Sequence, residues 1–218
     1  MQDAAVFVDV DGTLVDSNFH HAIAWSRALR DHGENARLAA IHRLVGMGGS
    51  ELLESLIGRD DDAIRASWRE HFDQLLPEVL PFEGAAELLR AFHAHGVTVV
   101  LATSSPEDLL DVLRAKIGAD DAIDVVVTAG DADQAKPHPD IFDTALEKSH
   151  ADPGRVVVLG DSVWDVEAAK RAHLPCVGVE TGGFSRMELE ASGAVAVFRD
   201  PADLIARMAE SPFNDLWT

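Results

Sequence analysis

Six short runs rich in Val, Ile and Ala are spaced along the chain, and helical patterns separate most of them. The runs cover residues 4–8, 97–102, 125–128, 156–159, 176–179 and 194–198. The helical patterns cover residues 83–95, 107–117, 139–149 and 163–172. Strands that are almost continuously apolar, alternating with helices, are typical of a parallel sheet covered on both faces. Because crossovers between parallel strands are right-handed, the pattern predicts an α/β fold with a Rossmann-like, doubly wound parallel sheet.

One long interval interrupts this alternation. Between about residues 16 and 81 no strand pattern occurs, and helical patterns occupy residues 20–32, 38–44, 50–57 and 61–76. Two prolines, Pro77 and Pro81, indicate a linker at the end of the interval. We therefore predict an all-α domain of residues 16–81, inserted into a core of residues 1–15 and 82–218.

The charge of the chain limits its partners. Acidic residues number 38 and basic residues 18, so the formal net charge is −20. A surface this negative repels phosphate backbones, which argues against nucleic-acid binding, and a well-solvated surface is its simplest explanation. An anionic substrate must then be attracted by a local positive site, such as a metal ion or a buried lysine.

The single cysteine, Cys176, cannot form an intrachain disulfide, and its apolar surroundings predict a buried structural thiol. The sequence shows no basic targeting segment and no apolar run near the roughly 20 residues that a membrane span needs. We expect a cytoplasmic protein that does not enter the membrane and exists as a monomer or a loose homodimer.

Acidic side chains follow two of the predicted strands. Asp9 and Asp11 come directly after the first strand, and Asp161 and Asp165 follow the fourth. Ligands bind at the carboxyl ends of parallel strands, and carboxylates this close together are costly unless a cation joins them. Magnesium accepts one or two carboxylates together with substrate phosphate oxygens. An Asx-type turn for the first pair, and a plain helix N-cap at Asp161 or Ser162, are the structural alternatives.

Two further segments follow strands and could bind an anion. Thr103, Ser104 and Ser105 precede the proline that opens a helix, where hydroxyls and exposed amides can hold a phosphate, although Ser-Pro is also a common helix start. Lys136 is one of four lysines and is followed by Pro137. A lone lysine is usually solvated, but the prolines that follow this one restrict the backbone that positions it and start the next helix.

Taken together, these segments resemble the haloacid dehalogenase superfamily of phosphotransferases, and the resemblance extends from residue 6 to about residue 198. The inserted helices resemble the family's small cap, as in phosphoglycolate phosphatases and β-phosphoglucomutases. The four family motifs are matched in order by Asp9-Val10-Asp11-Gly12-Thr13, by Thr103, by Lys136 in Lys-Pro-His-Pro-Asp, and by Gly160-Asp161-Ser162 with Asp165.

This resemblance implies a Mg²⁺-dependent phosphatase that acts on a small phosphorylated metabolite. Asp9 would attack phosphorus to form an aspartyl-phosphate, and Asp11 would protonate the leaving oxygen and then activate water. The metal would be held by the Asp9 side chain, the Asp11 carbonyl and Asp161, while Asp165 would orient a metal-bound water or support the lysine.

The remaining motifs supply phosphate contacts in the same analogy. Thr103 and the Ser104 amide would hold phosphate oxygens, and Lys136 would neutralise charge in the transition state. Dehalogenases of the superfamily lack an acid at the position of Asp11, and phosphonatases usually have a small residue there. An acid at this position therefore favours phosphate chemistry.

The inserted helices would select the substrate. His21 resembles a histidine of β-phosphoglucomutases, although a helix-face histidine is the simpler interpretation. Gly48 and Gly49 belong to a loop that could approach a ligand or could simply connect two helices. This loop carries no cation, which favours hydrolysis over a mutase that must bind a second phosphate, although Arg43 could serve. A sugar-phosphate mutase and a catalytically silent binding protein remain the alternatives.

Overall fold

The computed structural model describes residues 4–217 and contains a six-stranded sheet in the order β3-β2-β1-β4-β5-β6. All neighbouring strands are parallel. The strands are β1 (Ala5–Val8), β2 (Thr98–Ala102), β3 (Val125–Val127), β4 (Val156–Gly160), β5 (Cys176–Val179) and β6 (Ala196–Phe198). The chain builds the sheet outward from β1 in one direction and then from β4 in the other. This parallel strand order is that of a doubly wound sheet, so the predicted fold class is confirmed. In such folds ligands bind at the switch point, which here lies between β1 and β4.

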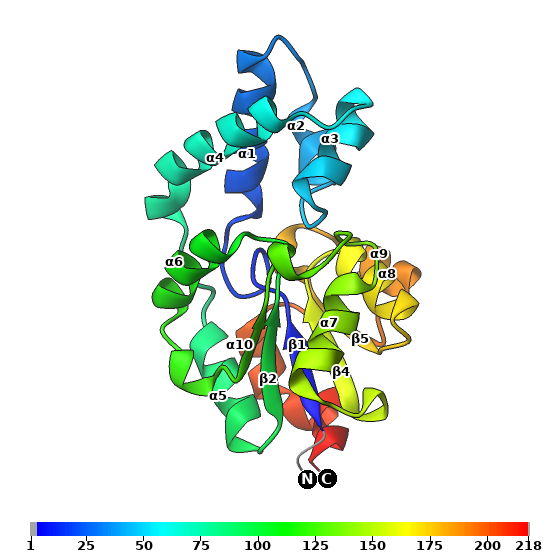
Figure 1. The fold of residues 1–218 in the computed structure, drawn as a ribbon. Helices are drawn as coiled ribbons and strands as arrows, with labels where there is room; N and C mark the ends of the chain where they lie inside the picture. Colours follow the sequence, from blue (N-terminus) through cyan, green and yellow to red (C-terminus); the bar gives the residue numbers. More distant parts are fainter. Residues whose placement is uncertain (1–3, 218) are drawn as a thin grey trace.

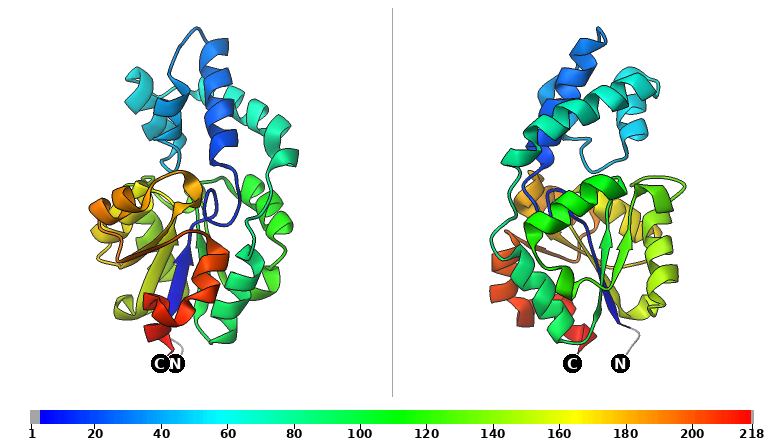
Figure 2. Two further views of the ribbon diagram at one scale, coloured as in Figure 1. Left: turned by 180° about the vertical axis from the view of Figure 1, so that it is seen from behind. Right: turned by 60° about the vertical axis from the view of Figure 1, so that its left-hand side comes forward.

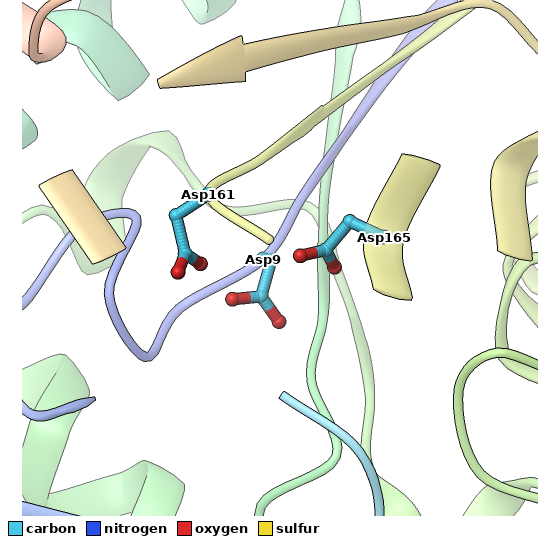
Figure 3. Close-up of side chains that lie close together, drawn as sticks. All are labelled: Asp9, Asp161 and Asp165. Atoms are coloured by element: carbon cyan, nitrogen blue, oxygen red, sulfur yellow. The ribbon is translucent and has the colours of Figure 1, made fainter. Parts of the chain in front are cut away.

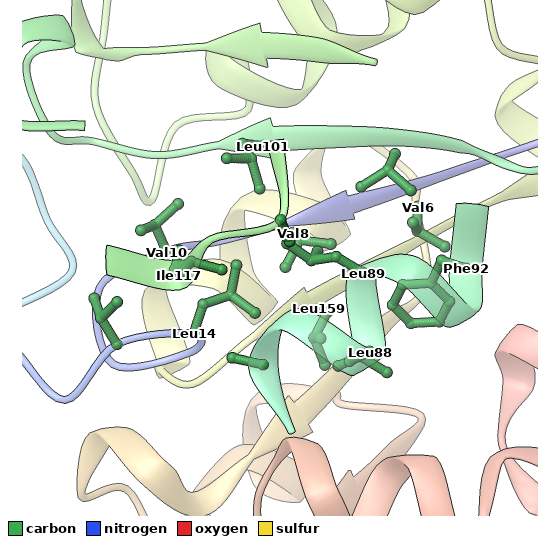
Figure 4. Packing of buried hydrophobic residues seen from close by; sticks show 14 of the residues in the cluster. Val6, Val8, Val10, Leu14, Leu88, Leu89, Phe92, Leu101, Ile117 and Leu159 are labelled. Atoms are coloured by element: carbon green, nitrogen blue, oxygen red, sulfur yellow. The ribbon is translucent and has the colours of Figure 1, made fainter. Parts of the chain in front are cut away.

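Successive side chains of β1 point to opposite faces of the sheet and enter two separate apolar clusters. Val6 and Val8 pack in one cluster, whereas Ala5 and Phe7 belong to the other. The first cluster includes residues of α5 (Ala85–Ala94), α6 (Glu107–Ile117) and α10 (Pro201–Ala206) (Figure 4). The second includes residues of α7 (Asp140–Ser149), α8 (Val163–Arg171) and α9 (Arg186–Ser192). Helices therefore cover both faces of the sheet, as continuously apolar strands require.

The first four of the α-helices between β1 and β2 form a separate layer beyond the carboxyl ends of the strands (Figures 1 and 2). They are α1 (Asn18–Asp31), α2 (Leu38–His42), α3 (Gly49–Ile57) and α4 (Asp62–Leu75). The layer has its own apolar cluster, which includes Trp25, Leu29 and Ile64. We refer to α1–α4 as the helical layer.

The two segments that connect the helical layer to the sheet lie side by side. The Asp16 amide donates to the Leu80 carbonyl at 2.9 Å, and the Phe82 amide donates to the Leu14 carbonyl at the same distance. The predicted linker at 77–81 overlaps a short 3₁₀ helix, Leu76–Glu78. Further 3₁₀ turns are Asp120–Ala122, Ala129–Asp131, Pro153–Arg155, Glu180–Gly182, Met208–Glu210 and Pro212–Leu216.

Cys176 is buried, as its apolar neighbours predict. Within residues 4–217, none of the helices combines the length and the apolar character that crossing a bilayer demands.

Candidate active site

Three carboxylates meet where β1 and β4 end (Figure 3). Asp9 follows β1, Asp161 follows β4, and Asp165 lies in the first turn of α8. All three are buried, and each offers an oxygen within 4.8 Å of one from the others. The parallel sheet brings these residues together from opposite ends of the sequence, because neighbouring strands end at one edge.

Local structure fixes Asp165 in this cluster. Ser162 is the N-cap of α8, and its hydroxyl lies 2.5 Å from Asp165 Oδ2 in a capping box. The N-cap expected at Asp161 or Ser162 is therefore Ser162. Its role leaves Asp161 free to face Asp9 across the sheet edge.

A buried lysine balances part of this negative charge. Lys136 is 1% exposed, and its Nζ lies 2.6 Å from Asp9 Oδ1 and 2.7 Å from Asp165 Oδ1. It also donates to the Ala102 carbonyl at 3.2 Å. Burial opposes the charged form, but Asp165 and Asp9 outweigh this effect and raise the pKa of Lys136. The lysine is therefore a permanent buried cation, and the solvated alternative is wrong.

One lysine does not neutralise three carboxylates. Burial raises the pKa of Asp9 to about 7 despite the nearby lysine, with a further contribution from Asp165. Burial and the neighbouring carboxylates also raise the pKa of Asp161 well above its usual value. Because burial makes the ionised forms of Asp9 and Asp161 unfavourable, a bound hard divalent cation would stabilise these ionised forms strongly. Their oxygen donors and excess charge fit such an ion.

Asp161 is held by two side chains that sequence reasoning missed. Thr13 donates to its Oδ1 at 2.9 Å, and Asn18 Nδ2 donates to its Oδ2 at 2.8 Å. A Cβ at Gly182 would collide with the same carboxylate, so the turn after β5 approaches Asp161 closely. Thr13 was visible in the first motif, but Asn18 and Gly182 carry no pattern of their own.

Asp11 accepts hydrogen bonds in a different corner of the site. Ser17 and Ser105 each donate a hydroxyl at 2.6 Å, and His21 Nε2 lies 2.9 Å from Asp11 Oδ1. Burial raises the pKa of Asp11, but His21 and the two hydroxyls outweigh this effect and lower it to about 2. Asp11 is therefore held as a carboxylate.

His21 is a buried residue of α1. Its ring stacks on Phe72 of α4 with centroids 4.0 Å apart, while Nε2 faces Asp11. This geometry connects the helical layer to the sheet edge.

The hydroxyl segment after β2 reaches the same site. Thr103 is buried, and its Oγ1 accepts a hydrogen bond from the Ser105 amide at 3.1 Å. Ser104 Oγ is buried without a hydrogen-bond partner among residues 4–217. Ser105, whose hydroxyl binds Asp11, was part of the predicted segment without a role of its own.

A cavity of about 220 Å³ separates the sheet edge from the helical layer. Asp9, Asp11 and Ser104 line its floor, and Gly49 contributes to its opposite side. Gly48 does not belong to this lining; a Cβ there would meet Ala135 and Glu51. The arginine that lines the cavity is Arg65, whereas Arg43 pairs with Glu188 outside it.

Comparisons with known proteins agree with this geometry. Residues 4–173 match the model of a hydrolase family described as haloacid dehalogenase-like hydrolase. The chain is 30% identical to validoxylamine A 7'-phosphate phosphatase of Streptomyces hygroscopicus subsp. limoneus, over 83% of this chain and 87% of that protein. It is 33% identical to a phosphoglycolate phosphatase of Rhodospirillum rubrum, over 92% and 88%. A hydrolase structure from Pseudomonas syringae superposes with a TM-score of 0.90 at 31% identity, covering 95% of this chain and 98% of that one.

Proposed function

This chain belongs to the haloacid dehalogenase-like hydrolases, and from that premise we propose that it is a Mg²⁺-dependent phosphatase that hydrolyses a small phosphate monoester through phosphorylated Asp9. The observation that carries this proposal is the buried Asp9 carboxylate on the cavity floor, 2.6 Å from Lys136 and clustered with Asp161 and Asp165. A carboxylate nucleophile needs such countercharge to approach an anionic phosphate.

Mg²⁺ would be held by Asp9, Asp161 and Asp165 together with the Asp11 main chain, and when bound it would neutralise the charge between Asp9 and the substrate. Lys136 fixes Asp9 Oδ1 and stays protonated, so it supplies a constant positive charge. Thr103 and Ser104 border the place of the phosphate, where hydroxyls and amides can donate to its oxygens.

The reaction has two proton transfers, and Asp11 is placed to take part in both. When the phosphoryl group passes to Asp9, the bond from phosphorus to the alcohol oxygen breaks and that oxygen takes up a proton. Water then attacks phosphorus, loses a proton and releases free Asp9. The ionised Asp11 of this structure is ready for the second step. For the first step its proton must be supplied, and the imidazole of His21, 2.9 Å from Asp11 Oδ1, is placed to supply it.

We assign residues 16–81 as a cap that closes over residues 1–15 and 82–218. Support comes from the paired connecting segments, which join the helical layer to the sheet at one place. A cap on such a hinge can exclude water while the substrate is bound.

The ion pairs of Arg65, the arginine that lines the cavity, favour hydrolysis over mutase chemistry. A mutase must bind a second phosphate of a bisphosphate, which calls for a free cationic side chain. Arg65 already pairs with Asp60 and Asp62, and Arg43 pairs with Glu188.

The test is phosphate release from a panel of metabolite monophosphates, with and without Mg²⁺. Asp9→Asn should abolish release and the acid-stable phosphate label on the protein, while its circular dichroism spectrum stays unchanged. Full activity of this variant would exclude Asp9 as the nucleophile. Isomerisation of a sugar 1-phosphate without free phosphate would show a mutase instead.

A further inference from the structure

The part of the cavity that faces the phosphate site is aromatic and apolar. Trp25, Leu52 and Trp68 line it from α1, α3 and α4. The two indoles stack with ring centroids 5.0 Å apart and 15° between their planes. Trp68 also stacks on His21 at 5.6 Å, so this wall reaches the histidine that faces Asp11. The alcohol portion of a bound ester would therefore contact the two indole side chains.

The same side of the cavity offers no unpaired positive charge. Among the described lining residues, Arg65 is the one lysine or arginine. Its guanidinium binds the carboxylates of Asp60 and Asp62, and Nη1 also donates to Ser50 at 3.0 Å. Because two carboxylates pair with one guanidinium, the group formed by Asp60, Asp62 and Arg65 has a formal net negative charge. An anionic group here would lose hydration and gain no cation in return.

The size of the cavity restricts the alcohol as well. Its volume of about 220 Å³ includes the space beside Asp9 that the phosphate must occupy. Pockets for drug-sized ligands measure roughly 300–1,000 Å³. An ester held within this cavity alone has a small alcohol portion, on the scale of a polyol or a single ring.

We propose that this cavity selects phosphate monoesters of small neutral alcohols, such as polyols and single-ring sugars, and rejects esters whose alcohol portion carries a carboxylate or a second phosphate. This proposal rests on the phosphatase function above and adds the class of substrate. A neutral alcohol packs its C–H surface on the Trp25–Trp68 wall, where burial of apolar surface is favourable. An anionic alcohol would meet the same wall, where the lining guanidinium of Arg65 already pairs with Asp60 and Asp62, so its charge would be buried without a partner.

The kinetic test uses matched esters that differ in one charged group. The pairs are 2-hydroxyethyl phosphate against phosphoglycolate, and fructose 6-phosphate against fructose 1,6-bisphosphate. We expect kcat/KM to favour the neutral member of each pair by about tenfold or more, because burying a charge without a partner costs at least that much. An equal or higher kcat/KM for phosphoglycolate would overturn the proposal and leave the phosphatase function standing.

A charge variant tests the cause of the preference. In the double variant Asp60→Asn/Asp62→Asn, Arg65 loses both carboxylate partners, so the ratio of anionic to neutral kcat/KM should rise by about tenfold. Asp73→Asn is the matched control. Asp73 is an exposed acid of α4, the helix that begins at Asp62, and it pairs with Arg69. This control should leave the ratio unchanged. An unchanged ratio in the double variant would show that the pairing of Arg65 does not set specificity.

A binding measurement separates failure of this proposal from failure of the phosphatase function. Asp9→Asn protein with Mg²⁺ is titrated with each ester while tryptophan fluorescence is recorded. Neutral esters should change the emission at lower concentration than their anionic partners, and Trp68→Phe should reduce the change. Phosphoglycolate binding as tightly as 2-hydroxyethyl phosphate would overturn the proposal even if the wild-type protein released phosphate from no ester.

Discussion

Replacing Lys136 by methionine should test the charge balance of the site most directly. The lysine Nζ lies 2.6 Å and 2.7 Å from oxygens of Asp9 and Asp165, and all three side chains are buried. Lys136→Met keeps most of the side-chain volume but leaves the acidic cluster without its cation. Removing one partner of a buried pair costs about 3–5 kcal/mol, because the other charge stays buried and uncompensated. We therefore expect the free energy of unfolding to fall by about that amount.

Urea unfolding in EDTA, followed by circular dichroism, measures this loss. Lys148→Met is the matched control: its Nζ lies 2.6 Å from Asp131 Oδ1, but the side chain is 40% exposed. Exposed pairs contribute about 0–1 kcal/mol, so the control should lose no more than that. Adding Asp9→Asn to Lys136→Met removes one unpaired carboxylate and should restore part of the lost stability. Equal losses in the two lysine variants would refute the charge-balance argument.

Two other perturbations act on single contacts of the site. His21→Asn should lower kcat more than it raises KM, because it removes a partner of Asp11; a change confined to KM in steady-state kinetics would contradict this role. Asn18→Ala removes the 2.8 Å hydrogen bond to Asp161 and should weaken Mg²⁺ binding by about 10–100-fold, measured by calorimetry on the apoprotein. Unchanged Mg²⁺ affinity would show that Asn18 does not orient Asp161.

The strands and the acidic residues at their ends could be predicted because both are local patterns. The run 97–102 is apolar except for Thr98, and it forms β2 with one residue fewer at its start. Helices α9 and α10, which have seven and six residues, were not predicted. The last strand begins at Ala196, two residues later than predicted, since the Ala194 amide still donates to the Leu189 carbonyl of α9 and the hydrogen bonds to β5 begin only at the Val195 amide.

The residues that surround the acids could not be predicted, because their contacts depend on the finished fold. Asn18 binds a carboxylate 143 positions away, and Ser105 binds one 94 positions away. Nothing in the local sequence distinguishes Asn18 from an ordinary helix-start residue. Similarly, the composition of the helical layer shows its tryptophans, but the stacking of Trp25 on Trp68 requires α1 and α4 to pack together.

The charge of the whole chain and the pairing inside the site lead to one further expectation. A protein with a formal charge of −20 repels a phosphate ester, so binding depends on local positive charge. Lys136 is shared between two carboxylates, and Arg65 is paired with two others. Neither cation is free for the phosphate, so a divalent ion at the acidic cluster must supply the attraction. EDTA should therefore abolish phosphate release instead of reducing it, and Mg²⁺ should restore it. Release that continues at a constant rate in EDTA would show that Lys136 and the backbone amides suffice.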